Sequence, residues 1–157
     1  MSQKAQTESV KLLWIGDSIV EKWEGYGKQV WEYYYSDRNA LNLGVNSDCT
    51  QNVIWRLEHG NMGDNNHDFK PKLAIVMIGQ NNGPYYTSEE IADGVITIIE
   101  YLRDKQPHMY ILLIAIFQRG AHPTPERKVL KGANDILYKY SKKVDNVHFM
   151  DVNGIEK

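Results

Sequence analysis

The sequence contains a single cysteine, Cys49, so no disulfide bond can form within the chain. Its apolar runs are far shorter than the roughly 20 residues that a membrane-spanning helix requires. Residues 1–10 are polar and lack the apolar block of a secretory signal peptide, and no Asn-x-Ser/Thr acceptor for glycosylation occurs. These absences predict a protein of the reducing cytoplasm without a membrane span.

An excess of charge of either sign is also lacking. Lys and Arg number 18, Asp and Glu number 20, and the formal net charge is −2. Because no basic run interleaved with aromatics occurs either, nucleic acid is not expected as a partner. The glycine-rich phosphate loops of nucleotide-binding proteins are missing, as are His, Cys and carboxylate groups at metal-ligand spacing, so we expect neither a cofactor nor a metal.

What is present suits one globular domain of 157 residues, of which 42% are hydrophobic. Five short apolar runs are predicted to form strands: residues 11–16, 40–45, 72–79, 110–117 and 147–152. The third and fourth runs are nearly continuous in Ile, Val and Leu. Such runs are typical of strands that are covered on both faces of a parallel sheet.

Helical patterns separate these runs, and residues 19–36, interrupted by Gly25 and Gly27, are also expected to be largely helical. Three other helices are predicted from their caps. One starts with the capping box of Thr87 and Glu90 and ends before Pro107; a second is capped by Asp48, with Gln51 at its third position, and ends at Gly60. The third is capped by Thr124, with Pro125 at its first position. The helix after Thr87 is expected to bury one apolar face, formed by Ile91, Val95, Ile98, Ile99 and Leu102.

This strand–helix alternation predicts a single doubly wound α/β domain with three layers, flavodoxin-like in architecture. The expected sheet is parallel and five-stranded, in the order 2-1-3-4-5. Residues 1–10 are predicted to be a polar tail and residues 11–157 the domain. No helical pattern follows the fifth strand, so the last helix of such a fold is expected to be missing and the apolar face beneath it to be bare.

In an open parallel sheet, ligands bind at the carboxyl ends of the strands. The polar residues and glycines expected at those ends include Gly16, Asp17 and Ser18, then Gly44 and Asn46, then Gly79, Gln80, Asn81 and Asn82. A serine hydroxyl, backbone amides beside glycines and carboxamide donors therefore converge on one edge. Acyl transfer to a serine requires this set, because a nucleophile must lie beside donors aimed at the developing oxyanion.

Each of these residues also has a purely structural interpretation. Ser18 and Glu21 have the spacing of a capping box, so Ser18 could serve only as a helix cap. Asp17 could support the turn before that helix, and Gly44 could ease a strand-to-helix turn. Cys49 could be a thiol nucleophile, although a cysteine at a helix start is more commonly structural. The combination is more specific than any one of its parts.

The stretches "IGDS" at 15–18, "ALNLGV" with Gly44, and "GQNN" at 79–82 resemble, in this order, the first three sequence blocks of the SGNH, or GDSL-type, hydrolase family. The closer resemblance is to the catalytic subunits of intracellular platelet-activating-factor acetylhydrolase, supported by "KPKLAIVMIGQNN" and "RGAHPTPER". It runs from about residue 11 to the C-terminus.

The resemblance implies that Ser18 is the nucleophile. Its oxyanion hole would consist of the backbone amides of Ser18 and Gly44 and the side chain of Asn81. Asp17 would orient the nucleophile turn. The other residues implied to support the site or to line the substrate cleft are Asn82 and His122.

The family completes its catalytic triad with an Asp-x-x-His pair beyond the fifth strand, and this sequence ends before such a pair. Two pairs have the same spacing, Asp64 with His67 and Asp145 with His148, but both are expected at the amino ends of strands, on the wrong edge of the sheet. Only His122 is expected at the carboxyl edge, where it is more typical of a loop residue than of a base. A serine hydroxyl without a base is a poor nucleophile at neutral pH.

We therefore expect a serine ester hydrolase that removes a short acyl group, such as acetyl, from a lipid or other small ester through an acyl-enzyme on Ser18. The alternative is a catalytically inactive binding or regulatory subunit with the SGNH fold. The absent last helix favours this alternative, and the presence of Ser18, Gly44 and Asn81 opposes it. The resemblance further implies a homo- or heterodimer and, in animals, a β-propeller regulatory partner.

Overall fold

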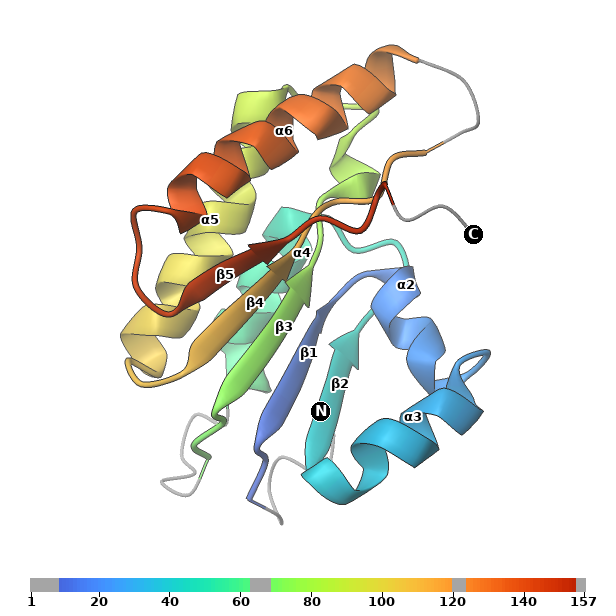
Figure 1. Cartoon of the computed structure of the whole chain (residues 1–157), viewed down its shortest axis with the longest axis vertical. Helices are drawn as coiled ribbons and strands as arrows, with labels where there is room; N and C mark the ends of the chain where they lie inside the picture. The colour runs from blue at the N-terminus through green and yellow to red at the C-terminus, as the bar shows by residue number, and fades with distance from the viewer. Residues whose placement is uncertain (1–8, 63–68, 120–123, 155–157) are drawn as a thin grey trace.

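The computed structural model describes residues 9–62, 69–119 and 124–154. Its strands are β1 (Leu12–Gly16), β2 (Ala40–Gly44), β3 (Leu73–Met77), β4 (Tyr110–Ile114) and β5 (Val147–Met150). All five lie within the predicted runs and form one parallel sheet in the order β2-β1-β3-β4-β5 (Figure 1). The predicted fold class and strand order are confirmed.

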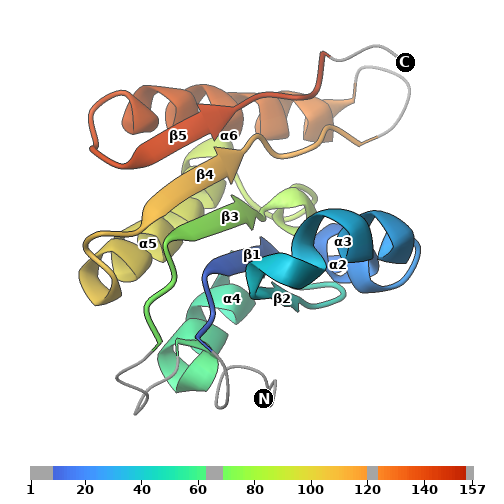
Figure 2. The same ribbon diagram turned by 60° about the horizontal axis from the view of Figure 1, so that its bottom comes forward.

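The longer helices are α3 (Lys28–Tyr35), α4 (Thr50–Arg56), α5 (Ser88–Lys105) and α6 (Pro125–Ser141). The short ones are α2 (Ser18–Glu21), η1 (Lys22–Glu24), η2 (Ser36–Arg38), η3 (Leu57–Asn61) and η4 (Gln80–Asn82). Helices α4, α5 and α6 cover one face of the sheet, and α2 with α3 lies against the other (Figures 1 and 2). The three predicted layers are therefore present. No helix of the described ranges is long and apolar enough to cross a bilayer.

Local capping signals position the two longest helices as predicted. The Thr87 hydroxyl accepts a hydrogen bond from the Glu90 amide at 3.2 Å, and the Glu90 carboxylate accepts one from the Thr87 amide at 2.8 Å. Thr124 caps α6, and Pro125 is the first residue of that helix. The capping side chains accept hydrogen bonds from first-turn amides that have no partner within the helix. Because the residues involved are only a few positions apart, the helix starts can be predicted from the sequence.

Two predicted caps are wrong by one residue, and both belong to helices that begin at the carboxyl edge of the sheet. Helix α2 is capped by Asp17, whose side chain accepts from the Ile19 amide, so Ser18 is the first helical residue and not the cap. Helix α4 is capped by Cys49 and not by Asp48. Residue Asn52, and not Gln51, consequently occupies the third helical position. The Asp48 carboxylate is unavailable as a cap because it forms an ion pair, described below.

The sheet divides the apolar core into two parts. The larger part lies under α4, α5 and α6, and alternate residues of every strand point into it. The five apolar residues predicted on the inner face of α5 are all completely buried: Ile91, Val95, Ile98, Ile99 and Leu102. Val10 is also buried in this part, so packed structure begins inside the segment predicted to be a tail.

The smaller part of the core is an aromatic cluster on the opposite face. Trp14 of β1 lies 5.5 Å from Trp23, 6.0 Å from Trp31 and 5.3 Å from Tyr35, measured between ring centroids. These rings attach η1 and α3 to the sheet, in the tilted and edge-to-face arrangements that aromatic pairs prefer. The Trp14 Nε1 atom is buried and has no hydrogen-bond partner among the described residues.

On this same face, no helix within the described ranges covers β4 and β5 (Figure 1). Leu112 and Ile114 are half-buried, and Tyr110 and Met150 are 53% and 46% exposed. The expectation of a bare apolar surface next to the fifth strand agrees with this arrangement.

Gly44 permits helix α2 to lie directly against the end of β2. A Cβ atom at Gly44 would approach the Glu21 nitrogen to 2.2 Å and the Val20 carbonyl carbon to 2.7 Å. Both contacts are with backbone atoms, which cannot rotate away. Glycine is therefore needed here for close approach, and its φ angle does not have to be positive.

We predict that Gly44→Ala lowers the free energy of unfolding by about 3 kcal/mol, because the added methyl group must displace α2. Gly154→Ala is the control, since a Cβ there meets nothing within 4 Å. Urea denaturation followed by far-UV circular dichroism measures both variants. Equal midpoints for the two would show that α2 adjusts to the methyl group without cost.

Candidate active site

The carboxyl ends of β1, β2 and β3 are level with one another. Gly16 is paired with Gly44 on one side and with Met77 on the other. The turns that follow the three strands therefore start from the same edge, and they carry the residues that the sequence singles out. Ser18, the Gly44 turn and Asn81 come to one place in the fold, as the doubly wound topology predicts.

Ser18 is held at the start of α2 by its neighbour. The Asp17 Oδ1 atom accepts the Ile19 amide at 2.9 Å, and the Asp17 carbonyl accepts the Glu21 amide at 3.0 Å. Asp17 is 1% exposed, whereas Ser18 is half-buried. Asp17 therefore fixes the backbone of the turn that carries Ser18.

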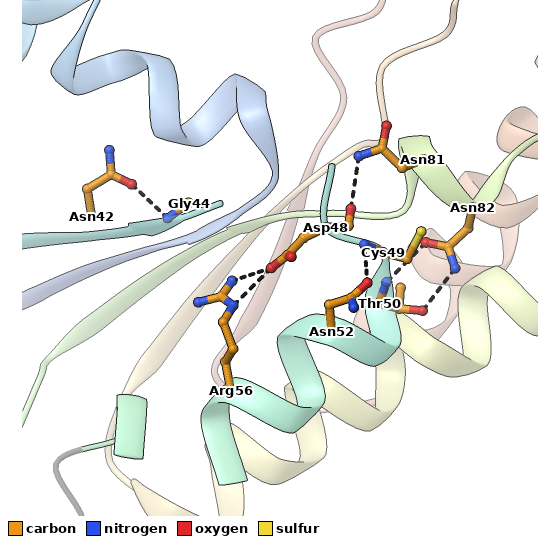
Figure 3. Close-up of polar contacts among 9 residues, drawn as sticks. All are labelled: Asn42, Gly44, Asp48, Cys49, Thr50, Asn52, Arg56, Asn81 and Asn82. Atoms are coloured by element: carbon orange, nitrogen blue, oxygen red, sulfur yellow. Dashed lines mark hydrogen bonds and ion pairs between the residues drawn. The ribbon is translucent and has the colours of Figure 1, made fainter. Parts of the chain in front are cut away.

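The Gly44 amide is already engaged in this structure. It donates to Asn42 Oδ1 at 2.8 Å (Figure 3). The Asn42 Nδ2 atom donates to the Val20 carbonyl at 2.8 Å. Asn42 thus bonds the end of β2 to α2 through both atoms of its amide. An oxyanion can receive the Gly44 hydrogen only if Asn42 releases it.

The turn after β2 offers a second backbone amide. Ser47 has φ of 66°, in the left-handed region that glycine or asparagine usually occupies. Around it, the Val45 amide donates to the Gly16 carbonyl at 3.2 Å and the Asp48 amide to the Val45 carbonyl at 3.3 Å. The Ser47 amide has no acceptor among the described residues. This residue was not identified from the sequence, because "VNSD" gives no sign of which residue turns left-handed.

Two asparagines of η4 anchor this turn (Figure 3). Asn81 Nδ2 donates to the Asp48 carbonyl at 2.9 Å. Asn82, which is 2% exposed, accepts the Thr50 amide at 3.1 Å and donates to the Thr50 hydroxyl at 3.2 Å. The Asn81 amide group is therefore placed one residue from Ser47, and its second Nδ2 hydrogen has no acceptor among the described residues.

An ion pair fixes the same turn from the other side. Arg56 of α4 contacts Asp48 Oδ2 through Nε at 2.9 Å and through Nη2 at 2.6 Å. The two side chains are 17% and 10% exposed, so solvent screens the pair only weakly. Arg56 is a second residue that the sequence analysis missed, because it lies eight positions from its partner in a helix whose register was unknown.

The electrostatic environment of Asp17 disfavours its charge. Burial raises the pKa of the Asp17 carboxyl above its ordinary value of 3.8, the hydrogen bond from Ile19 opposes this shift, and the nearby Asp48 charge adds to it. Burial, followed by the Asp48 and Asp17 charges, likewise raises the pKa of the Cys49 thiol. A raised pKa leaves less thiolate at neutral pH, which argues against Cys49 as the nucleophile.

A family model described as "GDSL-like Lipase/Acylhydrolase family" matches residues 14–156. The chain belongs to this family. The match includes all the residues of the edge described above. The resemblance found from the first three sequence blocks is thereby confirmed at the level of the family.

Curated relatives of this GDSL-like chain include the human platelet-activating factor acetylhydrolase IB subunits alpha2 and alpha1, 33% and 29% identical over 143 residues. Each alignment covers 91% of this chain and 59% of the relative, so the chain spans little more than half the length of these relatives. AlinE4, described as an SGNH-hydrolase family esterase, is 26% identical with a TM-score of 0.69, covering 91% of this chain and 76% of its own.

A member of the lipolytic protein G-D-S-L family from Veillonella parvula has a TM-score of 0.75 at 18% identity, covering 90% of this chain and 77% of its own. At that identity it shows the fold alone. The sheet and helices of the GDSL-like chain are therefore those of the family.

The described histidines lie away from the carboxyl edge. His59 stacks on Trp55 near the end of α4, and His108 precedes β4. His148 lies near the start of β5 beside Tyr110, so the pair Asp145 and His148 is on the wrong edge, as expected. The other pair of the same spacing, Asp64 with His67, and the cleft residue His122 lie outside the described residues. In the parts of the chain that are described, no group of three or more His, Cys, Asp or Glu residues could hold a metal.

We predict that Arg56→Met lowers the free energy of unfolding by about 3 kcal/mol, because it leaves the Asp48 carboxylate buried without its partner. Lys131→Met is the control. It breaks the Lys131–Asp135 pair, whose side chains are 65% and 58% exposed, and should cost less than about 1 kcal/mol. Urea denaturation at pH 7 compares the two variants. A cost no larger for Arg56→Met than for Lys131→Met would mean that the pair does not hold the turn.

We predict that Asp17→Asn stabilises the protein at pH 7 and not in acid. Because the pKa of Asp17 is raised on folding, the wild type loses stability as pH rises from the ordinary value through the raised one. Asparagine carries no charge and can still accept the Ile19 hydrogen bond. Urea midpoints should favour the variant at pH 7 and converge below about pH 3.9. A variant less stable than wild type at both pH values contradicts this.

Proposed function

We propose that this chain carries the nucleophile and oxyanion hole of a serine ester hydrolase that removes a short acyl group, such as acetyl, from a lipid or other small ester. The observation that carries the proposal is the convergence of Ser18, the turn after β2 and Asn81 on one edge, with hydrogen bonds holding all three. Family membership supports it, and so do the names of the relatives, which include acetylhydrolase subunits and an esterase.

In the proposed reaction, Ser18 Oγ attacks the ester carbonyl carbon and its proton passes to a base. The carbonyl oxygen becomes an oxyanion. Its collapse breaks the bond to the ester oxygen, the base returns its proton to that oxygen so that the alcohol leaves, and the acyl group stays on Ser18. Water then attacks the acyl-enzyme, releasing the acid and restoring the serine. Donors already fixed in position stabilise the oxyanion without reorganising during the reaction.

Three donors are proposed for this oxyanion: the Ser18 amide, the second Nδ2 hydrogen of Asn81, and one amide of the turn after β2. Gly44 was predicted for the third, yet its hydrogen is held by Asn42. We favour the Ser47 amide, which has no acceptor among the described residues and lies one residue from the carbonyl that Asn81 contacts. The role of Gly44 would then be the close packing of α2.

The base must come from outside the described residues, because the described histidines do not reach the carboxyl edge. His122 is one such residue. An Asp-x-x-His pair beyond this sequence is the other source, and we favour it because the family places its pair after the fifth strand. Association as a dimer, a regulatory partner and a cytoplasmic location stay predictions.

A second candidate function is a non-catalytic subunit that retains the hydrolase fold. The positions of the described histidines favour the non-catalytic subunit, because none of them lies at the carboxyl edge of the sheet, where Ser18 is. Against it stands a network of asparagines at the same edge as the half-buried Ser18, in which Asn82 is buried and Asn42 and Asn81 are half-buried. A protein used only as a scaffold has no physical need to keep Ser18, Gly44 and Asn81 together at one edge.

A serine-directed organophosphonate tests whether Ser18 is activated. We predict one adduct by intact mass on a protein that contains the proposed base, and none on its Ser18→Ala variant. Ser36→Ala, at an exposed serine of η2, should label like the wild type. Asn81→Ala should slow labelling about a hundredfold, because it removes one oxyanion donor.

The absence of any adduct on a protein that contains the proposed base would favour the non-catalytic subunit. An adduct that persists on Ser18→Ala would move the nucleophile elsewhere.

A further inference from the structure

The segment after β4 is fixed at the same edge as the candidate site. Gln80, the neighbour of Asn81, donates from Nε2 to the Phe117 carbonyl at 3.0 Å. The Gln118 amide donates to Asn153 Oδ1 at 3.0 Å, and the Gln118 side chain accepts from Arg127 Nη2 at 2.7 Å. Arg119 therefore leaves a segment that is bonded on three sides.

The position of Arg119 relative to Ser18 follows from the strand order. Only β3 separates β1, which leads to Ser18, from β4, which leads to Arg119 (Figure 1). Asn81 follows β3 and so lies between them in the topology. The positive charge of Arg119 also lowers the pKa of Asp17, so its field reaches the turn that presents Ser18.

The guanidinium of Arg119 is only loosely paired. Its nearest carboxylate oxygen is Glu126 Oε1, at 3.7 Å from Nη1, and its side chain is 50% exposed. Glu126 Oε1 has no hydrogen-bond partner in the described part of the chain, so this contact is an ion pair without a hydrogen bond. Arg56, by contrast, gives two hydrogen bonds to Asp48 and is largely buried.

We propose that Arg119 binds an anionic group, a carboxylate or a phosphate, on the ester substrate, so that the site prefers anionic esters to neutral ones. Guanidinium is suited to this role because its planar set of donors matches both groups with paired hydrogen bonds. A weak contact with Glu126 keeps the side chain near the site and is readily replaced. This inference rests on the proposed function, since it names the substrate class of the same site.

Binding of non-hydrolysable amide analogues tests the proposal without needing a catalytic base. The probes are 4-acetamidobenzoate and 4-acetamidophenyl phosphate, with methyl 4-acetamidobenzoate as the neutral match. NMR titration of the full chain should give tighter binding of an anionic probe than of the neutral one. Arg119→Gln should weaken anion binding about fivefold, as expected for a half-exposed ion pair, and leave the neutral probe unchanged.

Two further variants sharpen the result. Glu126→Gln removes the competing carboxylate and should tighten anion binding. Arg103→Gln is the matched control, because Arg103 is also a partly exposed arginine paired with a carboxylate, Glu100, but lies at the far end of α5. It should change the affinity of no probe.

Any of three results would overturn the inference. The neutral and anionic probes could bind with equal affinity, Arg119→Gln and Arg103→Gln could have equal effects, or neither anion could bind. Preference for one anion identifies whether the group is a carboxylate or a phosphate, and supports it. Labelling of Ser18 by a neutral organophosphonate in Arg119→Gln reports the proposed function separately. Labelling retained without anion preference would overturn the inference alone. Labelling absent from the wild type as well, in a protein that contains the proposed base, would overturn both.

Discussion

The side-chain amides of Asn81 and Asn82 join the turn after β2 to the turn after β3, and the remaining geometry of the edge depends on them. Asn82 is buried, and a buried amide that loses its partners costs far more than the net gain of forming the bonds. The start of α4 is thus fixed to η4 as well as to β2, the strand that precedes it in the chain. With this contact in place, the turn containing Ser47 has little freedom to move relative to Asn81.

The two arginines near this edge differ in how strongly they are paired. Arg56 is largely buried and forms a short ion pair with Asp48. Arg119 is half-exposed, and its ion pair with Glu126 is long. Asp17, at the same edge, is buried and keeps its hydrogen bond from the Ile19 amide despite a raised pKa. A buried carboxylate that costs stability is typical of a residue kept for the position of its neighbour.

Much of the fold was predictable because its signals are local. The strands are short apolar runs, and Thr87 with Glu90 or Thr124 with Pro125 define helix starts without reference to the rest of the chain. The doubly wound topology then placed Ser18 and Asn81 on one edge. Prediction failed where a side chain has a partner that no local pattern indicates. Asp48 forms an ion pair with Arg56 and does not cap α4. The Gly44 amide donates to the Asn42 side chain. No local pattern marks the left-handed Ser47.

Because of the aromatic cluster, the tryptophans are distributed unequally over the two faces of the sheet. Of the four tryptophans, Trp14, Trp23 and Trp31 lie together on the α3 side of the sheet, and Trp55 is 60% exposed on α4. Helices α5 and α6 contain none. Fluorescence excited selectively at tryptophan therefore reports mainly on the docking of η1 and α3. Loosening of α5 and α6, whose aromatic residues are all tyrosines, would be nearly silent in that signal.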